Sequence, residues 1–79
     1  MEIVVNVKLK NGVLDPQGKA VHHALSSLGF NGIESVRIGK QIVLHVKEND
    51  KEKALKDAKL MCEELLANTV IEDFKIEIK

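Results

Sequence analysis

The chain has 79 residues, enough for one domain with one small core. A chain of this length buries only about 60% of its unfolded surface, so regular packing or association must add stability. Twelve basic and twelve acidic residues are interspersed, without the basic surplus typical of nucleic-acid binders. One cysteine excludes an intrachain disulfide, and no apolar run is long enough for a membrane span. We expect a single cytoplasmic domain, residues 1–79, that binds neither nucleic acid nor membrane.

The first strand and the first turn have clear signals. Apolar and polar residues alternate over residues 2–10 and predict a half-buried strand, with Val4 as an extra apolar residue on the polar face. Asn11-Gly12 predicts a turn, because both residues tolerate a positive φ. Asp15-Pro16 then predicts a helix N-cap followed by proline at the first helical position.

The first helix is expected to run to about Leu28. Gly29 is predicted as its left-handed C′ residue, with Phe30 at C″ folding back on Leu25. The apolar residues of this helix follow a 3.6-residue period and predict one buried stripe. The stripe consists of Ala20, Val21, Ala24, Leu25 and Leu28.

A hairpin is expected next. Residues 33–38 are rich in β-branched residues and predict a second strand, and residues 41–47 predict a third, with Gly39-Lys40 between them. A two-residue loop would set Val36 opposite Val43, and a three-residue loop would set it opposite Leu44. We favour the longer loop, because it gathers the apolar residues on one face. These residues are Val36, Ile38, Ile42, Leu44 and Val46.

The last third of the chain predicts a helix and a strand. Asn49 and Glu52 resemble a capping box, and Asn68 is a plausible C′ residue. Residues 70–78 alternate and predict the final strand. The segment between Asn49 and Asn68 has the clearest amphipathic helical pattern of the chain. Its apolar residues are Ala54, Leu55, Ala58, Met61, Cys62, Leu65 and Leu66.

The element order βαββαβ indicates an α+β fold. We expect a ferredoxin-like two-layer sandwich, with both helices on one face of a four-stranded antiparallel sheet. Nothing in the chain is left to cover the other face, on which Val4 and Val43 lie. Apolar residues on an uncovered face indicate a partner.

No constellation in the sequence supports catalysis. Gly12 to Lys19 resembles a phosphate-binding loop, but its glycine spacing is one residue too long, no Ser or Thr follows, and Asp15 adds a negative charge. The adjacent His22 and His23 diverge on a helix and cannot chelate one ion together. His45 is on a strand, and Cys62 belongs to the apolar stripe of the second helix. We expect no catalytic, cofactor-binding or metal-binding residue.

Two weaker signals point to surface roles or to other chemistry. Arg37 and Lys40 beside Gly39 could hold an anion, but a solvated hairpin tip explains them better. An acylphosphatase-like activity would suit the fold, yet the first strand-to-helix loop lacks the arginine that this chemistry needs. The residues by themselves therefore predict a small domain with an uncovered sheet face.

Three segments resemble the PurS family. They are LKNGVLDPQGKAV (residues 9–21), LGFNGIESVRIGK (residues 28–40) and MCEELLANTVIEDFKIEI (residues 61–78). Together they cover most of the chain, and the combination of GVLDPQG with LLAN-x-VIED is specific. Thr69 stands where the family usually has proline, which affects the stiffness of that turn. Phe74 replaces a frequent tyrosine.

The resemblance implies an accessory subunit of phosphoribosylformylglycinamidine synthase in purine biosynthesis. In such a complex a synthetase subunit, PurL, uses ATP and Mg²⁺, and a glutaminase subunit, PurQ, releases ammonia to convert formylglycinamide ribonucleotide to its amidine. The small subunit carries no catalytic residue or cofactor and helps the other two assemble. The resemblance thus implies a ligase subunit that is inactive alone, with PurL and PurQ as partners.

We also expect the chain to form a homo-oligomer, a dimer or larger, built through the uncovered face of the sheet. The interface residues that we expect are Val4, Val43, His45, Asp15, Gln17 and Arg37. Two other functions are open from the residues alone. One is a self-standing dimeric regulatory domain that binds a small metabolite, and the other is a small hydrolase.

Overall fold

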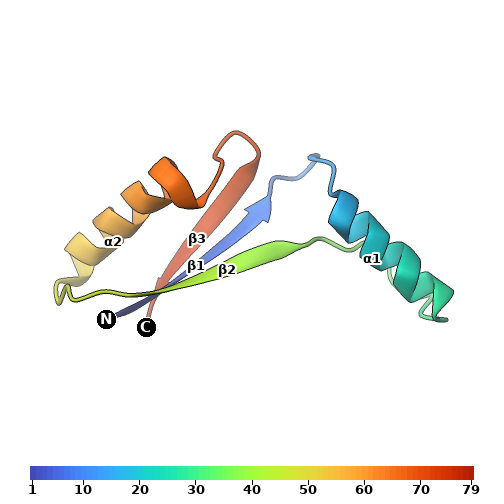
Figure 1. Cartoon of the computed structure of the whole chain (residues 1–79), viewed down its shortest axis with the longest axis horizontal. Coiled ribbons are helices and arrows are strands. Elements are labelled where there is room, and N and C mark those ends of the chain that lie inside the picture. Colours follow the sequence, from blue (N-terminus) through green and yellow to red (C-terminus); the bar gives the residue numbers. More distant parts are fainter.

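A computed structural model describes the whole chain, residues 1–79. Its elements are β1 (Glu2–Leu9), α1 (Pro16–Ser27), β2 (Gly39–His45), α2 (Lys51–Met61), the π-helical turn η1 (Cys62–Leu66) and β3 (Glu72–Ile78). The strands form one antiparallel sheet in the order β2-β1-β3, with β1 in the centre (Figure 1). The α+β class is confirmed. The predicted four-stranded sheet is wrong, because the sheet has three strands.

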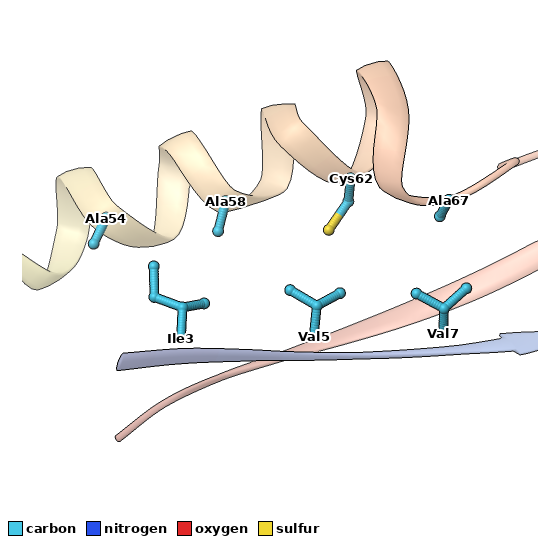
Figure 2. Packing of buried hydrophobic residues seen from close by; sticks show 7 residues of the cluster. All are labelled: Ile3, Val5, Val7, Ala54, Ala58, Cys62 and Ala67. Carbon is cyan, nitrogen blue, oxygen red and sulfur yellow. The ribbon is translucent and has the colours of Figure 1, made fainter. Parts of the chain in front are cut away.

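The core lies between this sheet and α2. Val5 is paired with Ile42 on β2 and with Ile76 on β3, which sets the apolar positions of all three strands on one face. From α2 the small side chains of Ala54 and Ala58 meet them, spaced four residues apart on one helix face. Figure 2 shows this layer, whose buried members are Ile3, Val5, Val7, Ala54, Ala58, Cys62 and Ala67.

The end of this helix departs from the α-helical period. The Ala67 N–H donates to the Cys62 carbonyl oxygen at 3.0 Å, so one extra residue fits into the last turn. Cys62 and Ala67, five residues apart, both face the core (Figure 2). The expected place of Leu65 in the buried stripe is therefore wrong, and its side chain is 84% exposed. Leu55 and Met61, also expected in the stripe, are exposed too.

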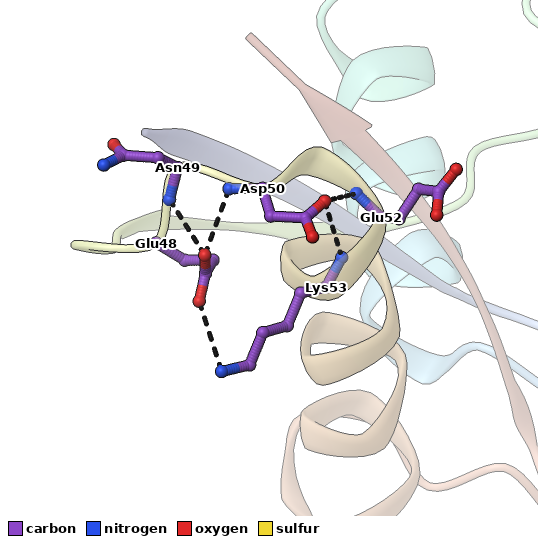
Figure 3. A network of polar contacts seen from close by, with 5 residues as sticks. All are labelled: Glu48, Asn49, Asp50, Glu52 and Lys53. Carbon is purple, nitrogen blue, oxygen red and sulfur yellow. Dashed lines mark hydrogen bonds and ion pairs between the residues drawn. The ribbon is translucent and has the colours of Figure 1, made fainter.

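A polar network fixes the N-terminus of α2, one residue later than expected. Asp50, not Asn49, is the N-cap, and its Oδ1 accepts from the N–H groups of Glu52 at 3.0 Å and Lys53 at 3.5 Å. Glu48 Oε1 accepts from the Asn49 and Asp50 N–H groups, and Glu48 Oε2 pairs with Lys53 Nζ at 3.4 Å (Figure 3). The bond from Asp50 N–H, more than the Lys53 charge, holds the pKa of the Glu48 carboxyl below its usual range.

The connection from α2 to β3, residues 62–71, also differs from expectation. Asn68 has no positive φ, so it is not a left-handed C′ residue. Its Oδ1 instead accepts from the Val70 N–H at 3.2 Å, and its N–H donates to Glu72 Oε1 at 2.7 Å. The strand begins at Glu72 rather than at residue 70, because Val70 and Ile71 belong to this turn.

The predicted hairpin is absent. Residues 33–38 form no strand, and Gly39 and Lys40 lie inside β2, paired with Lys8 and Val7 of β1. A Cβ atom on Gly39 would lie 2.8 Å from the Val7 carbonyl oxygen, which explains why glycine occupies this position beside β1. Both predicted loop registers are therefore wrong, because the strand that follows residue 38 pairs with β1 and not with the segment before it.

The position of α1 also differs from expectation. Residues 10–38, which we call the arm, carry α1 away from the sheet instead of laying it beside α2 (Figure 1). The radius of gyration is 16.0 Å, whereas a compact domain of this length has about 12 Å. The expectation of both helices on one sheet face is wrong, and of the α1 residues only Gly18 is buried. No other part of the chain therefore covers the apolar stripe of α1, which the sequence predicts to be buried.

Both ends of α1 nevertheless match the sequence prediction. Asp15 is the N-cap, with Pro16 at the first helical position. Gly29 has a φ of 99°, its N–H donates to the Ser26 carbonyl oxygen, and the Phe30 N–H donates to that of Leu25. These bonds form a Schellman motif, with Gly29 at the C′ position and Phe30 at the C″ position that the sequence predicts.

Candidate functional site

Asp15 joins the arm to the sheet. Asp15 is 5% exposed, and its carboxylate accepts two hydrogen bonds, Oδ1 from the Gly18 N–H at 2.9 Å and Oδ2 from the Ile38 N–H at 2.8 Å. The bond from Ile38, followed by that from Gly18, holds the pKa of Asp15 below its usual range against the effect of burial, and the Arg37 charge adds to it. One side chain thus connects the start of α1 to the residue before β2.

Arg37 also stabilises the junction between the arm and the sheet, through its guanidinium group. Nη1 donates to the Val13 carbonyl oxygen at 2.9 Å, and Nη2 donates to the Lys10 carbonyl oxygen at 3.1 Å. These bonds hold the turn that contains Gly12, whose φ is 87°. The guanidinium is therefore used inside the chain, which leaves fewer of its donors for an anion.

Gly18 brings α1 and the segment before β2 into direct contact. A Cβ atom at this position would collide with the Val36 carbonyl oxygen. A surface hollow of about 400 Å³ lies beside this contact, and its charged or polar walls include Lys19, His22 and Glu34. His22 Nε2 is 2.8 Å from the Ile33 carbonyl oxygen, so a ring N–H donates there. The Gly18 amide that a phosphate would need already bonds to Asp15.

The remaining candidates for chemistry lie apart. His22 is on the arm, whereas His45 is on the outer face of the sheet, 3.9 Å from a Glu2 carboxylate oxygen. Cys62 is fully buried in the core. Burial, with a smaller effect from Glu63, raises the pKa of its thiol. No group of three or more His, Cys, Asp or Glu side chains is placed to hold a metal ion.

The structure separates the six expected interface residues into two places. Val4 and Val43 are paired on the outer face of the sheet, and His45 lies at the end of the same strand as Val43. Val43 is 46% exposed, whereas Val4 is only 6% exposed, so the expectation that Val4 is uncovered is wrong. Asp15 and Gln17 line a hollow of about 220 Å³ between the arm and the sheet. Arg37 lies near it, beside Asp15. Polar residues such as Asn6 and Gln41, which share a hydrogen bond of 3.0 Å, occupy much of the outer face.

Larger exposed apolar side chains lie elsewhere, at positions that sequence reasoning missed. On the arm they are Leu14, Val21, Leu28 and Phe30, with Leu28 73% exposed. Leu65 and Val70, both on the α2–β3 connection, are 84% and 81% exposed. Leu28 and Leu65 were assigned to buried stripes, since periodicity identifies an apolar face but not what covers it. None of the helices has the length and apolarity needed to cross a membrane.

Comparison with known proteins gives one consistent family. The profile described as "PurS: Phosphoribosylformylglycinamidine (FGAM) synthase" matches residues 2–79. The phosphoribosylformylglycinamidine synthase subunit PurS of Bacillus subtilis is 49% identical over 78 residues, which cover 99% of this chain and 92% of the relative.

Solved structures agree with this family. The crystal structure of Methanocaldococcus jannaschii PurS is 40% identical, with a TM-score of 0.88 over 99% of this chain and 94% of that chain. A chain in the structure of PurLQS from Thermotoga maritima is 33% identical, with a TM-score of 0.87 over 96% of this chain and 93% of that chain. The extended arm is thus compatible with the fold of the solved relatives.

Proposed function

This chain belongs to the PurS family, and we propose that it is the non-catalytic assembly subunit of phosphoribosylformylglycinamidine synthase. The names of the relatives of this chain refer to this synthase and to the purine biosynthetic pathway. The observation that supports an assembly role is the exposed apolar surface on the arm and on the α2–β3 connection. Surfaces of this kind mark sites of protein association.

The chemistry of the complex belongs in this proposal to two other chains. PurL uses ATP, Mg²⁺ and formylglycinamide ribonucleotide, and PurQ releases ammonia from glutamine. The structure named PurLQS supports both as partners of this chain. The side chains here support the same division, because the Gly18 amide bonds to a carboxylate and Cys62 is buried as a thiol.

Self-association is the second part of the proposal. The arm leaves the apolar face of α1 without cover from its own chain, and only ten of 79 residues are buried. A chain with so small a core gains most from covering this face with a second copy. We place the main contact between copies on the arm. The outer-face residues Val4, Val43 and His45 form a second candidate contact, as do Asp15, Gln17 and Arg37 at the junction.

Reconstitution of the synthase tests the assembly role. With PurL and PurQ present, leaving out this chain should abolish synthesis from glutamine and preserve synthesis from added ammonium. The role is wrong if glutamine-dependent synthesis persists at full rate without the chain.

Sedimentation of the purified chain tests self-association. Leu28→Ser should shift the chain towards monomer, because it removes apolar area from the contact. Val43→Lys probes the outer face in the same assay, by placing a charge there. A stable monomer in the unsubstituted chain would contradict self-association. Dissociation by Val43→Lys alone would move the contact to the sheet.

A further inference from the structure

The α2–β3 connection, residues 62–71, is held in one shape although it carries the most exposed apolar side chains. The Ile71 and Glu72 N–H groups donate to the Asn68 carbonyl oxygen at 3.0 and 2.7 Å. Asn68 makes further bonds to Val70 N–H and to the Glu72 side chain. Leu65 and Val70 are 84% and 81% exposed on this framework. A surface of this kind is already ordered before it binds, so binding it costs little entropy.

The π-helical turn is the reason that Leu65 points outward. In a continuous α-helix, Leu65 would lie near the face that contains Ala58 and Cys62. The extra residue in the turn places Ala67 in the core instead. A regular helix would have directed a leucine towards the core here, where burial of its apolar side chain would stabilise the fold. Turns of this type are frequent at functional sites, and this one exposes an apolar side chain at the expense of the core.

The charges beside Leu65 are also unfavourable within the chain. Glu63 and Glu64 are exposed at the C-terminal end of the helix, where the macrodipole favours cations. Neither glutamate takes part in any of the three ion pairs of the structure. Two carboxylates beside an exposed leucine are complementary to a surface that is apolar and bordered by Lys or Arg.

We propose that the α2–β3 connection docks, through Leu65 and Val70, into an apolar pocket bordered by basic residues on a partner subunit of the synthase. This inference rests on the proposed assembly role. The same connection of a second copy fits this surface less well. A two-fold contact between two connections would bring four glutamates together, and like charges across an interface are repulsive.

Binding of the full chain to purified PurL and PurQ tests the proposal. Leu65→Ser and Val70→Ser should each raise the Kd for one partner by about tenfold or more, as expected of interface anchors. Leu55→Ser, at another exposed leucine of the same helix, is the matched control and should leave the Kd within about twofold. All three variants should melt within about 3 °C of the parent, since the replaced side chains are exposed.

A charge reversal tests the basic border. Glu64→Lys should weaken binding and flatten its dependence on salt, whereas Glu34→Lys on the arm makes the same change of charge elsewhere and should do neither. If the parent binds PurL or PurQ and the Leu65, Val70 and Glu64 variants bind equally well, the docking surface is wrong and the assembly role stands. If the parent binds neither partner, both are wrong. If the variants lose only self-association, the occupant is a second copy and the proposal is overturned.

Discussion

Asp15 ties α1 to the start of β2 through one carboxylate, so stability should depend on its ionisation. Folding lowers the pKa of this group, which means that the folded state favours the charged form. The stabilisation is complete above the ordinary carboxyl pKa of about 3.9. It is lost as the pH falls through the lowered value.

Asp15→Asn should therefore melt several degrees below the parent at pH 7, and the difference should shrink as the pH falls below the ordinary carboxyl pKa of about 3.9. Thermal melts of both proteins across this range measure it. A difference that stays constant with pH would show that the charge of Asp15 contributes nothing to folding.

Gly18 is the second residue on which the arm depends. In Gly18→Ala the new Cβ atom would collide with the Val36 carbonyl oxygen, which belongs to the backbone and cannot rotate away. We expect a loss of about 1–3 kcal/mol, partly offset by the better helix propensity of alanine. Gly32→Ala is the control, because no atom lies within 4 Å of the added Cβ. Equal melting temperatures for the two variants would contradict the close contact.

At the scale of elements, sequence patterns predicted both ends of α1 well, but the ends of α2 and the strand partners poorly. Asp15, Pro16 and Gly29 act within one turn of the chain, so their local signals were sufficient for α1. Residues 33–38 have the composition of a strand, yet the Ile38 N–H bonds to the Asp15 side chain instead of to a neighbouring strand. Such a choice depends on contacts distant in sequence, which composition does not contain.

The sequence likewise predicted only some of the residues on the candidate surfaces. Val4 and Val43 were correctly placed on the outer face, because alternation fixes the face of each residue in a strand. Leu65 could not be assigned to the surface, since no residue type specifies a π-helical turn. The exposure of Leu28 depends on the direction in which the arm leaves the sheet, and this again is not a local property.

The arm should also be the least protected element in hydrogen exchange. In a dilute sample of monomers, α1 amides should exchange much faster than β1 amides, because α1 has little buried area of its own whereas β1 lies at the sheet centre. At high concentration or in the complex, α1 should become protected as its apolar face is covered. Equal protection of α1 and β1 in the monomer would show that the arm is stable without a partner.

At the scale of the whole molecule, the chain consists of a small closed body and an open arm. The body is the sheet with α2 on one face, and its core has seven buried side chains with partly buried ones packed against them. The molecule extends 49 Å along its longest axis, mainly because the arm continues beyond the sheet. An elongated chain with exposed apolar side chains at separate places is suited to contact more than one partner.

Cys62 is the one side chain of this chain that could act as a glutaminase nucleophile. A glutaminase needs an activated nucleophile, usually a cysteine with a base and an oxyanion hole. Cys62 is instead buried between α2 and the sheet, where burial raises the pKa of the thiol and keeps it protonated at neutral pH. The chain alone should therefore neither hydrolyse ATP nor release ammonia from glutamine.

Cys62→Ala should remove only packing, at a cost of about 1 kcal/mol for the small cavity. Complexes reconstituted with this variant should retain glutamine-dependent synthesis near the parent rate. Melting of the free variant is the control for folding, and synthesis from ammonium is the control for PurL. A variant that folds and assembles normally but cannot support synthesis from glutamine would place Cys62 in the chemistry. Full activity would leave shape and surface as the contribution of this chain, since its one thiol would then serve only to fill the core beneath the π-helical turn.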